Sequence, residues 1–309
     1  MALDVFRFQF ENNCIYRLFC EGMNVDKTKV NSLENIPFLP IEFFKTHTVV
    51  SNYSNIFQIF TSSGTTGMIT SKHFVSDLYL YEQSLEKAFG LFYGDPKDFV
   101  FLALLPSYLE REGSSLVYMV DTLMKISNSQ FNGYYLYNHS ELVQKLEYLK
   151  NENKKVILIG VSFALLDLAN HYSLQLPNTI IIETGGMKGR GKELIRNELH
   201  HIIKERLSPL RVDSEYGMTE LLSQAYLQKN DSFATPPWMR ILIRDIHDPS
   251  SYLGFNKNGG INVIDLANVN SCSFIQTQDM GKLYENQTFE VIGRFDNSDI
   301  RGCNLLVEI

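Results

Sequence analysis

The stretch KVILIGVSFALLDLANHYSLQLPNTIIIE, residues 155–183, decides the fold class. It begins and ends with short apolar runs, 155–160 and 179–183, which have the length of buried strands. Between them, residues 163–172 repeat apolar side chains at the three- and four-residue spacing of a helix. A strand, a helix and a second strand in this order are typical of a βαβ unit, whose two strands run parallel.

The same alternation of apolar runs and helical periods extends over most of the chain. Further strands are expected near 56–60, 99–105 and 132–137, and further helices at 76–90, 114–126, 140–151 and 188–206. Such an order predicts a layered α/β fold with mixed sheets flanked by helices.

From about residue 239 the pattern changes to short β-type segments with Gly and Asn at the turns. Immediately before them, Pro236 and Pro237 interrupt any regular element. We therefore expect two parts, an α/β core over residues 1–238 and a smaller β-rich subdomain over residues 239–309.

Composition excludes several classes of protein. The chain has 309 residues, 44% of them hydrophobic, which is enough for a large folded core. Its 28 Lys and Arg against 35 Asp and Glu give a net charge of −7, whereas proteins that bind nucleic acid usually carry a basic surplus. We therefore expect no nucleic-acid partner.

The apolar runs are much shorter than the roughly 20 residues that span a bilayer, so no membrane span is expected. Asp4 and Arg7 interrupt the apolar N-terminal stretch, which argues against a secretory signal and favours a cytoplasmic protein. The four cysteines lack CxxC spacing and should be free thiols. We assign Cys14, Cys20 and Cys272 to packing.

A loop rich in Ser, Thr and Gly follows the predicted strand 56–60. Its members with hydroxyl groups or without side chains are Thr61, Ser62, Ser63, Gly64, Thr65, Thr66 and Gly67, and Lys72 comes five residues later. Many backbone N–H and side-chain O–H groups around one turn suit an anionic phosphate. The spacing differs from a Walker A loop, and a flexible surface connector is the alternative interpretation.

The string TSSGTTG followed by a lysine resembles the phosphate-binding signature of the adenylate-forming enzymes, which include acyl-CoA synthetases and firefly-type luciferases. The resemblance implies that this loop contacts the β- and γ-phosphates of ATP. The later signatures of that superfamily follow in the same order along this chain.

Four further motifs carry the resemblance, and each has a structural alternative. The glycine pair that lies against adenine in that superfamily is matched by Gly185, Gly186 and Met187. The structural alternative is a Gly-rich entry to a helix. The segment 215–220, EYGMTE, matches the YGxTE motif, in which Tyr216 stacks on adenine beside Gly217, Thr219 contacts the α-phosphate and Glu220 binds Mg²⁺. Its alternative is a turn before a helix, with Thr219 as the cap and Glu220 in the first helical turn.

The last two motifs concern the ribose. The segment 277–281, TQDMG, resembles the TGD motif with Gln in place of Gly, and implies that Asp279 binds the ribose hydroxyls. The segment 293–302 matches the hinge motif and places Arg294 at the ribose. Asp279 could instead be a hairpin residue, and Arg294 a solvated charge beside a bulge. The motifs together predict a nucleotide between the α/β core and the β-rich part.

Most members of the superfamily continue beyond the hinge into a lid with a catalytic lysine, whereas this sequence ends at Ile309. We therefore expect no lid domain. The branch that the chain most resembles is the acyl-protein synthetase, the fatty-acid-activating component of bacterial bioluminescence. The segments 105–116 and 301–306 support this branch.

In that branch the acyl group passes from acyl-AMP to a cysteine near the C-terminus, and Cys303 occupies the equivalent place. A thiolate attacks a mixed anhydride readily, and Arg301 could lower the thiol pKa. The alternative is that Cys303 packs in a terminal strand.

Three functions remain open from the sequence. The first is an ATP- and Mg²⁺-dependent ligase that activates a carboxylic acid, expected to be a fatty acid, and passes it to Cys303 or an acceptor protein. The second transfers the acyl group to coenzyme A or a carrier protein. The third is a nucleotide-binding module without catalysis. We expect His73 to be structural, because an ionised substrate carboxylate needs no base to deprotonate it. The pair His200 and His201 is expected on the surface, because it lacks a carboxylate or cysteine at metal-ligand spacing.

Overall fold

The computed structural model of the chain describes residues 1–51, 55–62, 69–105, 113–135, 138–185, 194–228 and 231–295. Contacts divide the chain into two compact units. The central unit comprises residues 58–70 and 78–236, and the terminal unit comprises residues 1–57, 71–77 and the residues from Pro237 onward.

The described part of the central unit alternates strands and helices. Its elements are β2 Gln58–Thr61, α4 Leu78–Tyr93, a 3₁₀ turn Pro96–Asp98, β4 Val100–Leu104, α5 Ser115–Ser127, β5 Gly133–Tyr134, α6 His139–Asn151, β6 Val156–Val161, α7 Ser162–His171, β7 Leu176–Thr184, α8 Arg196–Leu207, β8 Pro209–Tyr216, β9 Ala225–Leu227 and β10 Phe233–Ala234.

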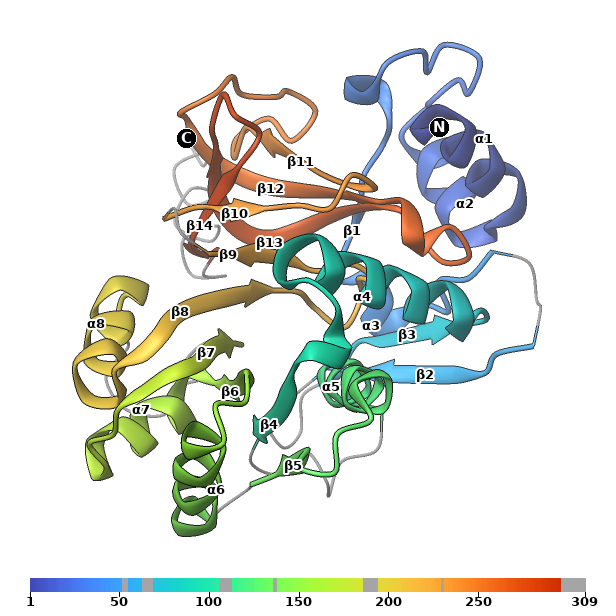
Figure 1. Cartoon of the computed structure of the whole chain (residues 1–309). Coiled ribbons are helices and arrows are strands. Elements are labelled where there is room, and N and C mark those ends of the chain that lie inside the picture. The colour runs from blue at the N-terminus through green and yellow to red at the C-terminus, as the bar shows by residue number, and fades with distance from the viewer. Residues whose placement is uncertain are drawn as a thin grey trace. The chain divides into compact units, whose positions relative to one another are not determined.

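The sheet of the central unit has the strand order β10-β9-β8-β7-β6-β4-β5 (Figure 1). Strands β5, β4, β6, β7 and β8 run parallel, and β9 and β10 continue the sheet antiparallel. Every residue of β4 and β6 is buried, as expected for parallel strands covered by helices. Helix α5 contacts β4, α7 contacts β6, and α8 contacts β8.

Local side-chain chemistry explains where these helices begin and end. Ser114 and Asn138 cap α5 and α6 by accepting hydrogen bonds from the backbone N–H groups of Val117 and Glu141. Helix α5 ends at Ser127 and is followed by Asn128, which has the left-handed conformation that Asn tolerates better than most residues.

The described part of the terminal unit is richer in strands. Its elements are α1 Ala2–Asn12, α2 Cys14–Gly22, a 3₁₀ turn Leu33–Asn35, β1 Leu39–Pro40, α3 Phe43–Thr46, β3 Lys72–Val75, β11 Met239–Arg244, β12 Asn258–Asp265, a 3₁₀ turn Leu266–Asn268, β13 Phe274–Leu283 and β14 Phe289–Arg294.

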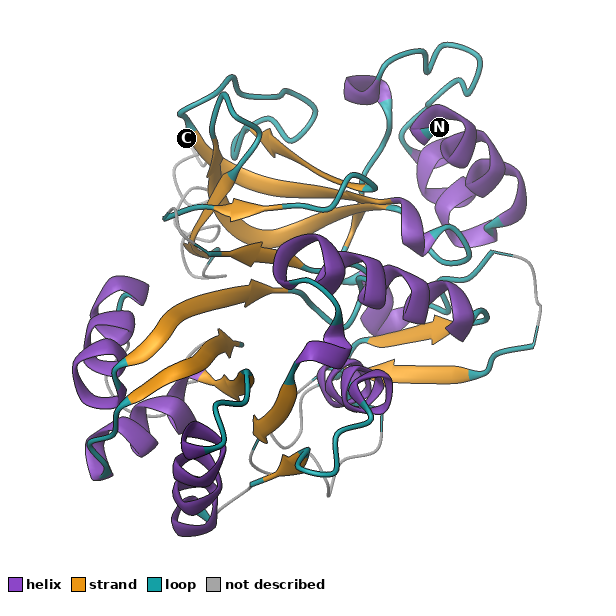
Figure 2. Ribbon diagram, in the orientation of Figure 1, coloured by secondary structure: helices purple, strands orange, loops and turns teal. Residues whose placement is uncertain are grey.

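Strands β11, β12, β13 and β14 form an antiparallel meander, and β1 joins β13 in parallel (Figure 2). Helices α1 and α2 pack against β13, since the rings of Phe6 and Tyr16 lie 6.5 and 6.0 Å from the ring of Phe274. The chain therefore brings its N-terminal helices onto strands more than 250 residues later in the sequence.

The layered α/β fold predicted from the sequence is confirmed. The start predicted for the helix over 188–206 is wrong. The helix expected over 188–206 starts at Arg196, because Ile195 has extended dihedral angles and its carbonyl accepts the first helical bond from Leu199. In the part of the chain that the structure describes, no helix is both long and apolar enough to cross a membrane.

Gln9 of α1 ties the N-terminal helix to the loop between β12 and β13. Its buried Nε2 lies 3.1, 2.8 and 3.2 Å from the carbonyl oxygens of Asn268, Val269 and Ser271, and its Oε1 accepts the N–H of Ser273 at 3.0 Å. One side chain thus satisfies several buried backbone groups.

Replacing Gln9 by Met should lower the free energy of unfolding by about 2–3 kcal/mol, because the methionine removes the hydrogen bonds that the Gln9 amide makes to these buried backbone groups. Chemical denaturation followed by circular dichroism measures the change. Arg7→Met on the exposed side of the same helix is the control, since it loses only a surface ion pair with Asp4. Equal stability of the two variants would contradict this role of Gln9.

Candidate functional site

Strands β7 and β8 bring two of the predicted nucleotide motifs together. The strands are parallel and neighbouring, and Glu183 of β7 is in register with Ser214 of β8. Gly185 follows the end of β7 and Gly217 follows the end of β8. In open α/β sheets, ligands bind at the carboxyl ends of such strands, so this edge is the candidate site.

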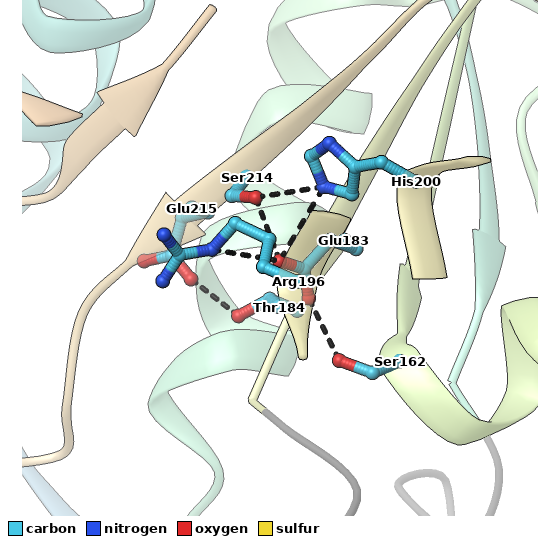
Figure 3. A network of polar contacts seen from close by, with 7 residues as sticks. All are labelled: Ser162, Glu183, Thr184, Arg196, His200, Ser214 and Glu215. Carbon is cyan, nitrogen blue, oxygen red and sulfur yellow. Dashed lines mark hydrogen bonds and ion pairs between the residues drawn. The ribbon is translucent and has the colours of Figure 1, made fainter. Parts of the chain in front are cut away.

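On one face of these two strand ends, the buried carboxylate of Glu183 is the centre of a polar network (Figure 3). Ser162 at the start of α7 donates to Oε2 at 2.7 Å, and Ser214 donates to Oε1 at 2.6 Å. From α8, the Nε atom of Arg196 and the Nε2 atom of His200 lie 3.9 and 3.8 Å from Oε1. The network thus connects β7 with β8, α7 and α8.

This environment keeps Glu183 ionised. Burial is the largest single influence and raises its pKa, but the contacts with His200, Ser214 and Ser162 together outweigh burial and hold the pKa below its ordinary value.

Ser214, His200 and Glu183 do not form a catalytic triad. In a triad the carboxylate binds the ring nitrogen that faces away from the serine. Here the serine Oγ and the carboxylate both lie near Nε2 of His200, at 3.1 and 3.8 Å, and Ser214 donates its proton to Glu183. The serine hydroxyl is therefore not activated for attack, and the network is structural.

One residue further along the two strands, the hydroxyl group of Thr184 on β7 donates a hydrogen bond to Oε2 of Glu215 on β8. Glu215 is buried, and burial raises its pKa from the ordinary value of 4.5 to about 7. The hydrogen bond from Thr184 opposes this rise, and the nearby negative charge of Glu183 adds to it. The two neighbouring carboxyl groups thus differ, because Glu183 has a lowered pKa and Glu215 a raised one.

The segment Tyr216–Glu220 leaves β8 as a turn. The ring of Tyr216 is buried, with its centroid 5.9 Å from that of Phe233. A Cβ atom on Gly217 would lie 2.3 Å from Oε1 of Glu215, so a larger residue there would force the Glu215 carboxylate to move. Thr219 is partly buried and the carboxylate of Glu220 is buried. The next element after Glu220 is the strand β9 and not a helix. The alternative of a helix cap at Thr219 is therefore wrong.

The described part of the predicted phosphate loop lies at the end of β2. Thr61 is the last residue of that strand, and its N–H donates to the carbonyl of Gly113 at 2.8 Å. Gly113 has a φ of +85° and packs against Ile59, which explains why glycine is needed there. Ser62 is partly buried.

In the terminal unit, the two residues predicted to bind ribose face each other. Asp279 of β13 is in register with Arg294 of β14, and Nε of Arg294 lies 3.0 Å from Oδ1 of Asp279. Asp279 is buried, whereas 77% of the Arg294 side chain is exposed. Asp279 is a residue of the β13–β14 hairpin, and the predicted bulge is also present, with Ile292 as the extra residue of β14.

Lys72 and His73 begin β3. The side chain of Lys72 is exposed. His73 is fully buried, its Nε2 lies 3.0 Å from Oδ1 of Asn268, and its ring packs edge-on against Phe44. The expected structural role of His73 is therefore confirmed.

Several predicted site residues lie outside the described residues: Ser63, Gly64, Thr65, Thr66, Gly67, Gly186, Met187 and Cys303. Of the other cysteines, Cys20 and Cys272 are buried as expected, and burial raises the pKa of Cys20 to about 12. The assignment of Cys14 to packing is wrong, because its side chain is exposed at the start of α2.

His200 was expected on the surface together with His201, and this expectation is wrong. His200 is buried and faces Ser214 and Glu183, whereas His201 is exposed. A signal was present in the sequence, because His200 directly follows Leu199 and lies three residues before Ile203 and seven before Leu207, all on the buried side of α8.

Replacing Glu215 by Gln should change how stability depends on pH. The folded protein holds the Glu215 proton up to about pH 7 and the unfolded chain releases it near 4.5, so the free energy of unfolding falls as pH rises between these values. Glu215→Gln lacks this dependence and should gain on the order of 3 kcal/mol relative to wild type between pH 4.5 and 8.

Denaturant titrations at several pH values measure the difference between wild type and Glu215→Gln. The exposed Glu152→Gln is the control and should follow wild type at every pH. Parallel stability curves for wild type and Glu215→Gln would show that Glu215 titrates normally.

Comparison with known proteins agrees with these motifs. Residues 1–86 match the family described as "Acyl-protein synthetase, LuxE". The long-chain-fatty-acid–luciferin-component ligase of Vibrio harveyi is 24% identical over 329 residues, which cover 97% of this chain and 84% of that protein.

Solved structures share the fold. A 2-hydroxyisobutyryl-CoA ligase in complex with 2-HIB-AMP and CoA matches 96% of this chain and 68% of its own, with a TM-score of 0.74 and 13% identity. ATP-bound MatB from Rhodopseudomonas palustris matches 78% of this chain with a TM-score of 0.61 and 15% identity, and the chain covers 48% of it, about half its length. The resemblance to the acyl-protein synthetases is thereby confirmed, and the chain has the fold of the adenylate-forming enzymes.

Proposed function

We propose that the chain is an ATP-dependent ligase that converts a carboxylic acid into acyl-AMP and passes the acyl group to a thiol. The observation that carries this proposal is the pairing of β7 and β8, which brings the predicted adenine-binding residues Gly185 and Tyr216 to one edge of the sheet. The fold shared with ATP-bound and acyl-AMP-bound ligases supports it. The Vibrio relative favours a long-chain fatty acid as the substrate.

The residues proposed for the phosphates are the loop Thr61–Gly67 and Lys72. Gly185, Gly186, Met187, Tyr216 and Gly217 are proposed for the adenine. Because a glycine has no side chain, a flat ring can approach the backbone closely at positions 185, 186 and 217.

For the ribose we propose Asp279 and Arg294. The carboxylate of Asp279 is buried beside one cationic partner, and its oxygens can accept hydrogen bonds from sugar hydroxyls. The exposed guanidinium of Arg294 has N–H groups beyond the Nε that binds Asp279.

Glu220 fits a magnesium site, with Thr219 beside it. In the described ranges no group of three or more His, Cys, Asp or Glu side chains could hold a metal ion by itself. Mg²⁺ in nucleotide sites uses one or two carboxylates together with substrate phosphates and water, so a single buried glutamate is a sufficient protein ligand. When bound, the ion neutralises charge on the phosphates.

In the first half-reaction the substrate carboxylate attacks the α-phosphorus of ATP, and pyrophosphate leaves with the electrons of the broken P–O bond. An ionised carboxylate needs no general base, so the protein contributes positioning and charge neutralisation. In the second half-reaction a thiolate attacks the acyl carbonyl and AMP leaves. Cys303 is the acceptor that we propose.

Coenzyme A is the alternative acceptor, because the structurally similar 2-hydroxyisobutyryl-CoA ligase is a complex with CoA. An acceptor protein or a carrier protein would receive the acyl group by the same thiol chemistry. The use of ATP and the free thiols of the described cysteines favour a cytoplasmic enzyme.

Glu220→Gln keeps the shape of the side chain but removes its negative charge. Acid-dependent exchange of pyrophosphate into ATP should fall by roughly 100-fold or more, because the metal loses its protein carboxylate. The exposed Glu198→Gln on α8 is the control and should retain wild-type exchange. Wild-type exchange in Glu220→Gln would show that Glu220 has no role at the metal.

Cys303→Ser separates the two half-reactions. The variant should form acyl-AMP at the wild-type rate, yet fail to retain a hydroxylamine-labile acyl label, since a serine hydroxyl is a poor nucleophile without a base. Mass spectrometry after incubation with ATP, Mg²⁺ and radiolabelled fatty acid measures both products. Labelling of Cys14 instead, or unimpaired ligation to coenzyme A, would remove Cys303 from the mechanism.

A further inference from the structure

Strands β7 and β8 are joined by side chains at two successive positions just before they end. Glu183 pairs with Ser214 and is bound to it by a hydrogen bond, and the next residues, Thr184 and Glu215, are also bound to each other. Since successive side chains of a strand point to opposite faces, the two links lie on opposite faces of the sheet.

The second link reaches the turn that follows β8. The two carboxyl oxygens of Glu215 have different neighbours: Oε2 accepts a hydrogen bond from the hydroxyl of Thr184, and Oε1 lies where a Cβ atom on Gly217 would clash with it. The hydroxyl of Thr184 belongs to the residue directly before Gly185, whose φ of +74° turns the chain away from β7. A single side-chain contact therefore connects the start of both turns.

This contact lies in the buried interior of the central unit. Glu215 is paired with Tyr226 of β9, whose ring is buried. The charge nearest to it on β7 is that of Glu183. A hydrogen bond between buried groups is costly to break, because neither partner can form a hydrogen bond to water in its place.

We propose that Thr184 and Glu215 are positioning residues that fix the Tyr216–Glu220 turn against the Gly185 turn and so set the affinity of the enzyme for ATP. This inference rests on the proposed function for its link to ATP. Its structural part, the coupling of the two turns, stands by itself and can be measured without any nucleotide.

The strand β7 offers a matched control. Thr179 is also fully buried, but among the described residues its hydroxyl has no hydrogen-bond partner. The same substitution, Thr to Val, therefore removes a hydrogen-bonded hydroxyl at position 184 and, at position 179, a hydroxyl without a partner among the described residues. Thr184→Ser, which retains the hydroxyl, is the conservative variant.

Hydrogen–deuterium exchange of the nucleotide-free protein tests the coupling of the turns. Thr184→Val should speed exchange in peptides covering 216–221 by about fivefold or more, whereas Thr179→Val and Thr184→Ser should match wild type. Equal exchange in Thr184→Val and Thr179→Val would overturn the positioning role, whether or not the chain proves to be a ligase.

Steady-state pyrophosphate exchange tests the consequence for ATP. Thr184→Val and Glu215→Ala should raise KM for ATP by about fivefold or more with a smaller change in kcat, and Glu215→Gln, which can still accept from Thr184, should recover most of this loss. An unchanged KM in Thr184→Val despite faster exchange in 216–221 would also overturn the proposal. If wild type itself shows no exchange with any acid, the proposed function fails, and the deuterium measurement alone decides on the coupling.

Discussion

The parallel pairing of β7 with β8 is the constraint on which the candidate site depends. Parallel neighbours end at the same edge of a sheet, so the turns that follow them are brought close without any contact between the turns themselves. Here those turns carry Gly185 and Tyr216, which are 31 positions apart in the sequence numbering. The hydrogen bond between Thr184 and Glu215 and the bond between Glu183 and Ser214 prevent the two strand ends from separating.

This arrangement places two carboxyl groups in the interior of the central unit on neighbouring strands, which is costly if both are ionised. The structure resolves the conflict by giving them different partners. Glu183 has hydrogen-bond donors on several sides and a lowered pKa, while Glu215 has one donor from Thr184 and a pKa of about 7. Charge is thus concentrated on the face where Arg196 of α8 can balance it.

Much of the central unit followed from the sequence because its strands are continuous apolar runs and its helices have a clear period. The ends of helices and strands were harder to predict, as the start of α8 at Arg196 shows. The extended dihedral angles of Ile195 cannot be inferred from the pattern of apolar residues. Strand β8 was not predicted, since its residues 211–216, RVDSEY, are mostly polar and become buried through partners on other elements.

Candidate site residues could be named from the sequence where a motif has a fixed order of residues. The role of a residue could not be predicted where it depends on which strands are neighbours and on their register. Glu220 and Asp279 could be named from their motifs, whereas the roles of Glu183, His200 and Glu215 depend on which strands are neighbours. Likewise, the ion pair of Asp279 with Arg294 depends on the register of β13 and β14.

The most direct measurement is hydrogen–deuterium exchange of the wild-type chain with and without a stable mimic of acyl-AMP, such as a fatty-acyl sulfamoyl adenosine. Slower exchange on binding is predicted at the ends of both strands, in peptides covering 183–187 and 214–220. A mimic that binds tightly but protects neither segment, or protects only one of them, would contradict the assignment of the nucleotide site to the paired ends of β7 and β8.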